Sequence, residues 1–129
     1  MPACSHVPAT RVVADAAALD TAVWPAEVTV LRLADDEVLA LGTTEAPALP
    51  DEHAIAVADH GWVVAELDSD ALERLVRHHI EWHVPKIRPW MGQGSIAGVP
   101  AKLVLPEGSD GALVVCAAAL AHEFEERTA

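Results

Sequence analysis

The stretch DSDALERLVRHHIEWHVP, residues 68–85, has the pattern of a single amphipathic helix set between segments that resemble strands. It opens with residue types that cap helix N-termini, namely Asp68, Ser69 and Asp70. Glu73 stands three residues after Asp70, the spacing of a capping box, and Pro85 cannot continue a helix. We therefore expect one helix that begins near residue 68 and ends at Pro85.

The segments before this helix have the composition and alternation of β-strands. EVTVLRL (27–33) and EVLALG (37–42) are joined by a short acidic turn and predict a β-hairpin. HAIAVA (53–58) and WVVAEL (62–67) flank Asp59, His60 and Gly61, where the glycine can supply the positive φ of a tight turn. We expect a second hairpin there.

After the helix, KIRPWMGQGSIAGVP (86–100) is rich in proline and glycine and predicts a structured surface loop. AKLVL (101–105) and ALVVC (112–116) are expected to pair across PEGSDG. The segment 117–129 predicts a closing helix. Its apolar face would consist of Ala117, Leu120, Ala121 and Phe124.

This order of strands, helix, strands and helix predicts an α+β fold: a largely antiparallel sheet with two main helices packed on one side. A length of 129 residues fits a single domain, residues 1–129. Residues 1–25 contain an aperiodic start, MPACSHVPAT, and an alanine-rich stretch with at most one weak helix. We expect them to form a loose N-terminal arm.

Composition narrows the possible partners. The formal net charge of -12 repels phosphate backbones and anionic lipid heads, so nucleic acid and membrane surfaces are poor partners, although an acidic surface also simply favours solubility. Charged residues interrupt each long apolar run, so no membrane span is expected. The chain has two cysteines and no recognisable targeting peptide, which favours a reduced, cytoplasmic setting.

The segment RHHIEWH (77–83) raises the question of a metal site. At about 100° per residue, His79 and His83 fall inside the apolar stripe of the predicted helix, and His78 falls at its edge. An i, i+4 histidine pair can bind one metal, but Glu81 stands two residues after His79, whereas the zincin motif places its glutamate directly after the first histidine. We expect His79 and His83 to pack on the sheet with hydrogen-bond partners, and His78 to stay in solvent.

Other constellations predict no catalytic residue. GQGSIAG lacks the preceding strand and the Lys-Ser/Thr pair of a phosphate loop, so it is interpreted as a turn. Ser95 has no nucleophile elbow, and Cys116 lies in an apolar strand that disfavours a thiolate. Trp62 is expected in the core, while Trp82, expected to be half-exposed, and Trp90 are candidate interface residues.

From Trp62 onward the chain resembles the folate-binding domain of the aminomethyltransferase superfamily, which includes the glycine-cleavage T-protein. The resemblance follows WVVAEL, DSDALERLVRHH, QGSIAGVPAKLVLPEG and DGALVVCAAALAHEFEERT in that order. LRLADDEVLALG and DEHAIAVADHGWVVAEL also resemble strand pairs of the sarcosine oxidase gamma subunit. The resemblance covers about 100 residues.

One departure from that superfamily bears on function. Catalytic relatives carry acidic residues in the strand that here reads IAGVPAKLVL, where residues 99–102 supply no carboxylate. The resemblance therefore implies a non-catalytic accessory subunit with no cofactor of its own. Its partners would be larger oxidase subunits that hold flavin and tetrahydrofolate and oxidise an N-methyl amino acid such as sarcosine. Two alternatives stay open: a degenerate folate-like small-molecule binding domain that uses a pocket beside WMGQGS, or a metal protein built on His79 and His83.

Overall fold

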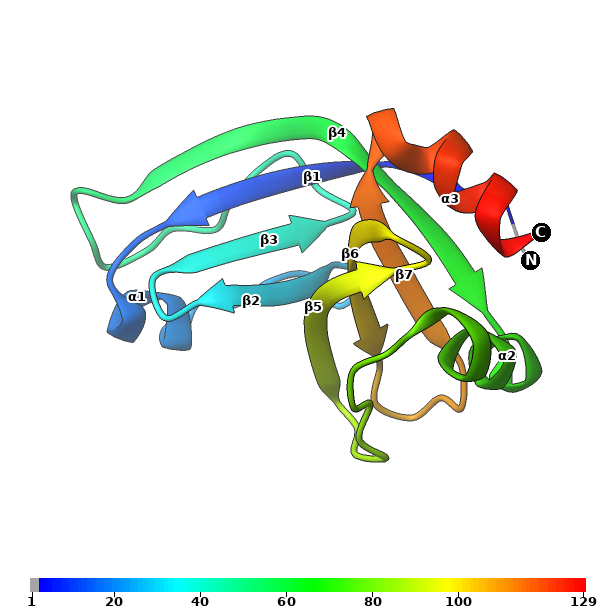
Figure 1. Ribbon diagram of the computed structural model, residues 1–129. Helices are drawn as coiled ribbons and strands as arrows, with labels where there is room; N and C mark the ends of the chain where they lie inside the picture. Colours follow the sequence, from blue (N-terminus) through cyan, green and yellow to red (C-terminus); the bar gives the residue numbers. More distant parts are fainter. Residues whose placement is uncertain (1–2) are drawn as a thin grey trace. The chain divides into compact units, whose positions relative to one another are not determined.

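The computed structural model describes residues 3–129 and has an α+β fold (Figure 1). Over these residues the helices are α1 (Ala16–Thr21), α2 (Ser69–His79) and α3 (Ala121–Thr128), the last preceded by the 3-10 turn η1 (Ala118–Leu120). The strands are β1 (Ser5–Val13), β2 (Thr29–Ala34), β3 (Glu37–Leu41), β4 (Ile55–Leu67), β5 (Trp90–Ile96), β6 (Val99–Leu105) and β7 (Ala112–Ala117). The predicted fold class is confirmed.

The strands of the described residues form one antiparallel sheet in the order β2-β3-β1-β4-β7-β6-β5. Contacts divide the chain into two compact units, an N-terminal unit of residues 7–60 and a C-terminal unit of residues 3–6 and 61–129. The boundary falls inside β4, so each unit contains half of this strand. That residues 1–129 fold as a single domain stays a prediction.

In the N-terminal unit, the predicted hairpin is confirmed, because β2 and β3 pair in register from Thr29↔Leu41 to Ala34↔Glu37. The expected loose arm is wrong for the residues that the structure describes. β1 pairs with β3 from Ala9↔Leu41 to Val13↔Glu37, and α1 follows it. The physical reason is burial: Val12, Ala14 and Leu19 belong to the same apolar cluster as Val38. Residues 1 and 2 of the arm lie outside the described residues.

The predicted second hairpin is also wrong. Residues 55–67 form one continuous strand, and Gly61 is not among the residues with positive φ. β7 pairs with β4 only from Trp62↔Ala117 to Leu67↔Ala112. Instead of reversing the chain, Gly61 is the first residue of β4 that belongs to the C-terminal unit.

In the C-terminal unit, α2 begins as predicted, but it ends six residues before Pro85. The carboxylate of Asp68 accepts a hydrogen bond from the Ala71 amide at 2.8 Å, so Asp68 is the N-cap and the box predicted for Asp70 and Glu73 is not formed. Ile80 is already extended, at φ -123° and ψ 124°, and only 9% exposed. The helix therefore ends where Ile80 turns its side chain into the core.

The predicted surface loop of residues 86–100 is wrong, because most of it is a hairpin. β5 and β6 pair from Trp90↔Leu105 to Ile96↔Val99. The turn between them consists of Ala97 and Gly98, with φ of 53° and 76°. The Ala97 amide also donates to the His79 carbonyl at 2.9 Å, which attaches this turn to the end of α2.

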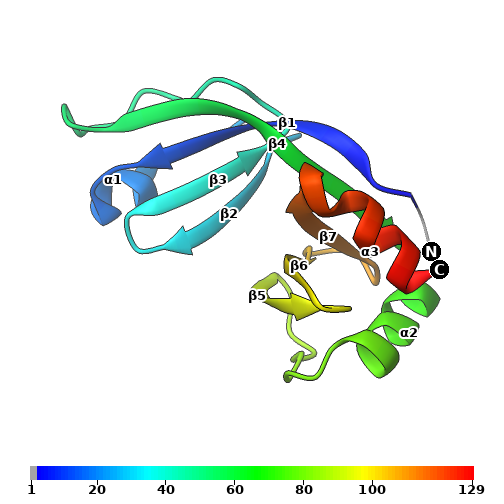
Figure 2. The same ribbon diagram turned by 45° about the horizontal axis from the view of Figure 1, so that its top comes forward.

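The expected pairing of residues 101–105 with 112–116 is confirmed by the register Ala101↔Cys116 to Val104↔Leu113. Alternate residues of β4, β6 and β7 form one core with Leu75 of α2 and Phe124 of α3, both fully buried. α2 and α3 thus cover the same face of these strands, as predicted (Figure 2). Ala117 ends β7 instead of beginning the closing helix. No helix formed by residues 3–129 is both long and apolar enough to span a bilayer.

Candidate functional site

The three histidines of RHHIEWH lie in different environments. His78 is exposed, as predicted, His79 is half-buried at the end of α2, and His83 is exposed in the following segment. The prediction that His83 packs inward is wrong, because α2 ends before it. Within residues 3–129, neither the His79 nor the His83 imidazole makes the expected hydrogen bond.

The i, i+4 geometry required by a metal site on His79 and His83 is therefore not formed. In the described part of the chain, no group of three or more His, Cys, Asp or Glu side chains is arranged to hold a metal ion. Metal binding through this pair has no support in the geometry.

Trp82 and Trp90 are both half-buried and pack over the glycines of β5. The Trp82 indole Nε1 donates to the Ser95 carbonyl at 2.8 Å, and the two indole centroids are 6.3 Å apart. A Cβ placed on Gly94 would lie 2.7 Å from Trp82 Nε1, so only glycine leaves room for this ring. The half-exposure predicted for Trp82 is confirmed. The GQG segment forms part of a strand, not the predicted turn, and the role of both indoles as interface residues stays a prediction.

A shallow depression, here called the tryptophan hollow, lies beside β5 near the predicted WMGQGS pocket. It has a volume of about 460 Å³ and is lined by Trp62, Gln93, Gly94, Ser95, Pro100, Ala101, Lys102, Ala117 and Leu120. The Lys102 ammonium lies 4.7 Å from the centre of the Trp62 ring, a cation–π contact. Trp62 is half-buried and not in the core as predicted, because it points to the face of β4 opposite the buried Val63.

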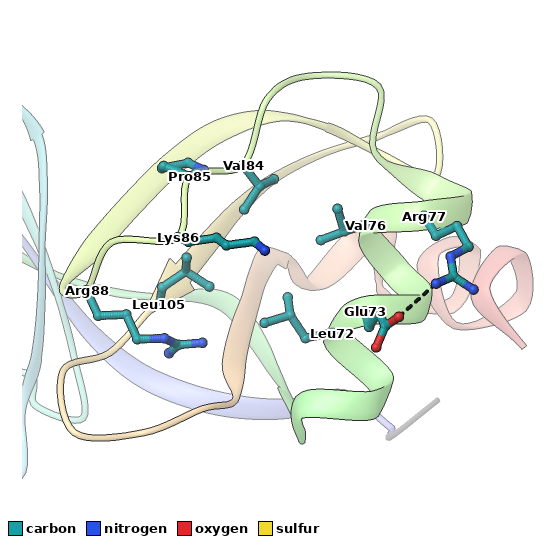
Figure 3. A pocket seen from close by; sticks show the side chains of 9 residues that line it. All are labelled: Leu72, Glu73, Val76, Arg77, Val84, Pro85, Lys86, Arg88 and Leu105. Carbon is teal, nitrogen blue, oxygen red and sulfur yellow. Dashed lines mark hydrogen bonds and ion pairs between the residues drawn. The ribbon is translucent and has the colours of Figure 1, made fainter.

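A second depression, here called the helix hollow, lies between α2 and the segment 84–88 (Figure 3). It has a volume of about 400 Å³ and is lined by Leu72, Glu73, Val76, Arg77, Val84, Pro85, Lys86, Arg88 and Leu105. Its apolar wall comes from three elements: Leu72 and Val76 of α2, Val84 of the segment, and Leu105 of β6. The helix hollow has the size of a small-molecule site, roughly 300–1,000 Å³.

The charges around the helix hollow are mostly positive. Three of the chain's eight Lys and Arg residues line it, against one acidic residue, Glu73. Arg77 pairs with Glu73 at 2.7 Å, which leaves Lys86 and Arg88 uncompensated by any lining carboxylate. The charge around the helix hollow is therefore positive, although the net charge of the whole chain is -12. No sequence reasoning identified this site, although the cations of KIRP directly after a helix were a visible signal.

Cys4 and Cys116 lie together in the C-terminal unit. Cys4 packs against the core cluster that contains Cys116, and its amide donates to the Glu125 carboxylate at 3.2 Å. Burial, with further contributions from Cys116 and Glu125, raises the pKa of the Cys4 thiol from its ordinary value of 9.0 to about 11. Burial also raises the pKa of Cys116, which agrees with the expectation that a thiolate is disfavoured there. Neither thiol is an activated nucleophile at neutral pH.

The first half of β4 presents apolar side chains to solvent. Ile55 is 61% exposed and Val57 is 57% exposed, and the alanines that follow each of them are exposed as well. β7 pairs with β4 only from Trp62, so Ile55–Ala58 lies beyond the reach of that partner strand. We call Ile55–Ala58 the apolar edge. Exposed apolar strand segments of this kind are usually covered by a partner or blocked by charges, and no charged residue interrupts this one.

No protein-family model matches the chain, and a search of curated proteins gives no significant match. The resemblance to the aminomethyltransferase superfamily thus rests on the sequence segments alone, and family membership stays a prediction.

Proposed function

We propose that this chain is a non-catalytic accessory subunit of a cytoplasmic, heteromeric complex of the sarcosine-oxidase type. In this proposal, larger partner subunits hold the flavin and the tetrahydrofolate and oxidise an N-methyl amino acid. The chain itself contributes a folded surface and no reacting group. The proposal draws on the sequence resemblance and on the strand 99–102, which supplies no carboxylate where catalytic relatives carry acidic residues.

The apolar edge is the observation that carries this proposal. Ile55 is 61% exposed and Val57 is 57% exposed, and both lie on a segment of β4 that β7 does not pair with. A partner strand laid along residues 55–58 would cover both side chains and extend the pairing. A surface of this type suits a chain that assembles with a partner.

The arrangement of reactive groups also favours a non-catalytic role. Both cysteine thiols are held protonated by burial, and Ser95 has its carbonyl, not its hydroxyl, engaged with Trp82. Within residues 3–129, no cluster of metal-ligating side chains is present. None of these groups is arranged for general acid–base or nucleophilic catalysis.

The experiment is a tagged purification of the full chain from the cells that make it. We expect two larger chains to co-elute in fixed ratio together with flavin absorbance. The double variant Ile55→Lys/Val57→Lys should lose at least nine-tenths of the co-eluting chains, because it places two charges in the proposed interface.

The matched control is Val23→Lys, which alters a valine that is 82% exposed and lies outside the apolar edge. It should retain the partners in full. Elution of the wild-type chain as a monomer without flavin chains would contradict the proposal, and so would full retention of the partners by the double variant.

The tryptophan hollow favours a second candidate, a degenerate folate-like binding domain. Its aromatic wall, Trp62, and its cation, Lys102, are the groups that a flat, anionic ligand requires. Calorimetric titration of the isolated chain with folate tests this candidate. Saturable binding that Trp62→Ala abolishes would support it, and absence of heat at millimolar folate would eliminate it.

A further inference from the structure

The helix hollow combines an apolar wall with cations that have no acidic partner. Leu105 at its base is 3% exposed, and Leu72, Val76 and Val84 are half-buried around it. These side chains belong to the C-terminal unit, so the wall does not depend on any other part of the chain. A ligand that fills this wall must be apolar over most of its surface.

Lys86 and Arg88 extend from the segment 84–88 toward α2, and Figure 3 shows both side chains directed into the space beside Leu72 and Val76. The Arg88 guanidinium is fixed by two backbone carbonyls, at 2.7 Å from Gly111 and 3.2 Å from Pro106, both through Nη1. Because both bonds use Nη1, a bidentate acceptor would meet the edge formed by Nη2 and Nε. These carbonyls orient the cation without neutralising it.

Lys86 makes no ion pair or hydrogen bond with residues 3–129. The one lining acid, Glu73, lies on the far side of the hollow and is bonded to Arg77 at 2.7 Å (Figure 3). Two cations, one of them held in a fixed orientation, therefore face a mainly apolar space. That arrangement is complementary to an anion attached to an apolar body, and it disfavours both neutral and cationic amphiphiles.

We propose that the helix hollow binds a small amphipathic carboxylate. The carboxylate lies between Lys86 and Arg88, and the apolar part of the ligand packs on Leu72, Val76, Val84 and Leu105. We choose a carboxylate as the head group because its two oxygens can accept two parallel hydrogen bonds from the planar guanidinium of Arg88. The backbone carbonyls hold this guanidinium through its other nitrogen, Nη1. This site is separate from the apolar edge and does not rest on the proposed accessory role.

The test uses octanoate as the probe and the full isolated chain. Isothermal titration calorimetry should give saturable binding at a ratio of one to one, and backbone amide NMR shifts should concentrate in residues 72–88 and around residue 105. Octylammonium and octanol should bind at least tenfold more weakly than octanoate, because only the carboxylate meets the two cations.

Lys86→Met should weaken octanoate binding at least fivefold, since the side chain keeps its length and loses its charge. The matched control is Arg74→Met, which also removes one exposed cation but does not line the helix hollow. It should change the dissociation constant by less than twofold. A substitution of Arg88 would also remove its hydrogen bonds to two backbone carbonyls, so it could disturb the fold. The second binding variant is therefore Val76→Trp, whose larger side chain fills the hollow and should abolish binding while both cations remain.

Absence of octanoate binding would overturn the proposal. So would equal binding by the Lys86→Met and Arg74→Met variants, or amide shifts confined to another surface. Equal affinity for octanoate and octanol would also overturn it, because the hollow would then be only an apolar contact surface. Each of these results leaves the co-elution test of the accessory role unaffected.

Discussion

The substitution Gly94→Ala should destabilise the protein through Trp82, although alanine is usually tolerated in a strand. A Cβ on residue 94 would lie 2.7 Å from Nε1 and 2.9 Å from Cε2 of the Trp82 indole. Contacts this short do not persist, so the ring must move away from β5. The hydrogen bond from Trp82 Nε1 to the Ser95 carbonyl, 2.8 Å long, would then be lost or stretched.

The expected magnitude follows from two losses and one gain. Loss of the indole hydrogen bond costs about 1 kcal/mol. A ring shift that exposes about 40 Å² of the roughly 200 Å² that a tryptophan buries costs about 1 kcal/mol more. Replacement of glycine by alanine restricts the unfolded chain and returns about 0.5–1 kcal/mol. We therefore expect the free energy of unfolding to fall by about 1–1.5 kcal/mol.

The assay is urea unfolding followed by far-UV circular dichroism, with Gly94→Ala made both in the wild-type chain and in a Trp82→Ala background. Without the indole, alanine at position 94 meets no ring and should be neutral or stabilising by up to about 1 kcal/mol. An equal loss of stability in the two backgrounds would refute the reasoning, because the cost could not then arise from contact with Trp82.

Three further predictions use the same stability assay or a simple chemical one. Phe124→Ala should lower the free energy of unfolding by about 3–5 kcal/mol, since this ring is fully buried in the core of the C-terminal unit; a loss below 1 kcal/mol would contradict that placement. Asp68→Ala should cost about 1 kcal/mol through loss of the α2 cap, whereas Asp70→Ala should cost less than half of that; the reverse order would show that Asp70 is the cap. Cys4 should react with iodoacetamide about 100-fold more slowly at pH 8 than an ordinary thiol, with a midpoint near pH 11, because its pKa is raised from 9.0 to about 11. Because the folded state holds the Cys4 proton more tightly than the unfolded state, this proton adds to the free energy of unfolding below pH 9, and that contribution is lost as the pH rises toward 11. A midpoint of the iodoacetamide reaction at pH 9 would contradict the burial of Cys4.

Elements defined by local pattern were predictable. The β2–β3 hairpin needs only two alternating segments and a short turn, and the β6–β7 pair is of the same kind. The start of α2 was also predictable, because an aspartate N-cap acts within three residues of itself. In these cases the hydrogen bonds that form the element join residues that are close in the sequence, so a local pattern predicts them.

Elements decided by distant packing were not predictable. The apolar stripe of α2 continues on a helical wheel to His83, but the burial of Ile80 outweighs the propensity of that stretch to stay helical. Gly61 has the composition of a turn and lies in a strand, because β4 has pairing partners along its length that the local sequence does not reveal. The N-terminal strand likewise depends on pairing with β3, about 30 residues further along the chain.

For the candidate sites too, features that depend on distant packing were not predictable from the sequence. Trp82 was correctly expected to be half-exposed, but helix periodicity is not the reason: Trp82 lies beyond the end of α2 and packs over Gly94 of β5. The helix hollow was missed because it requires α2, the segment 84–88 and Leu105 to come together, and no spacing in the sequence shows that approach. The positions of Lys86 and Arg88 beside an apolar wall are a tertiary property.

The most direct test of the accessory role is the mass and flavin content of the particle that contains this chain when it is purified from its own cells. Size-exclusion chromatography with light scattering and absorbance near 450 nm measures both in one run. The account predicts a particle several times heavier than the 13.6 kDa chain, with bound flavin and two larger subunits. A particle of 13.6 kDa without flavin would contradict it.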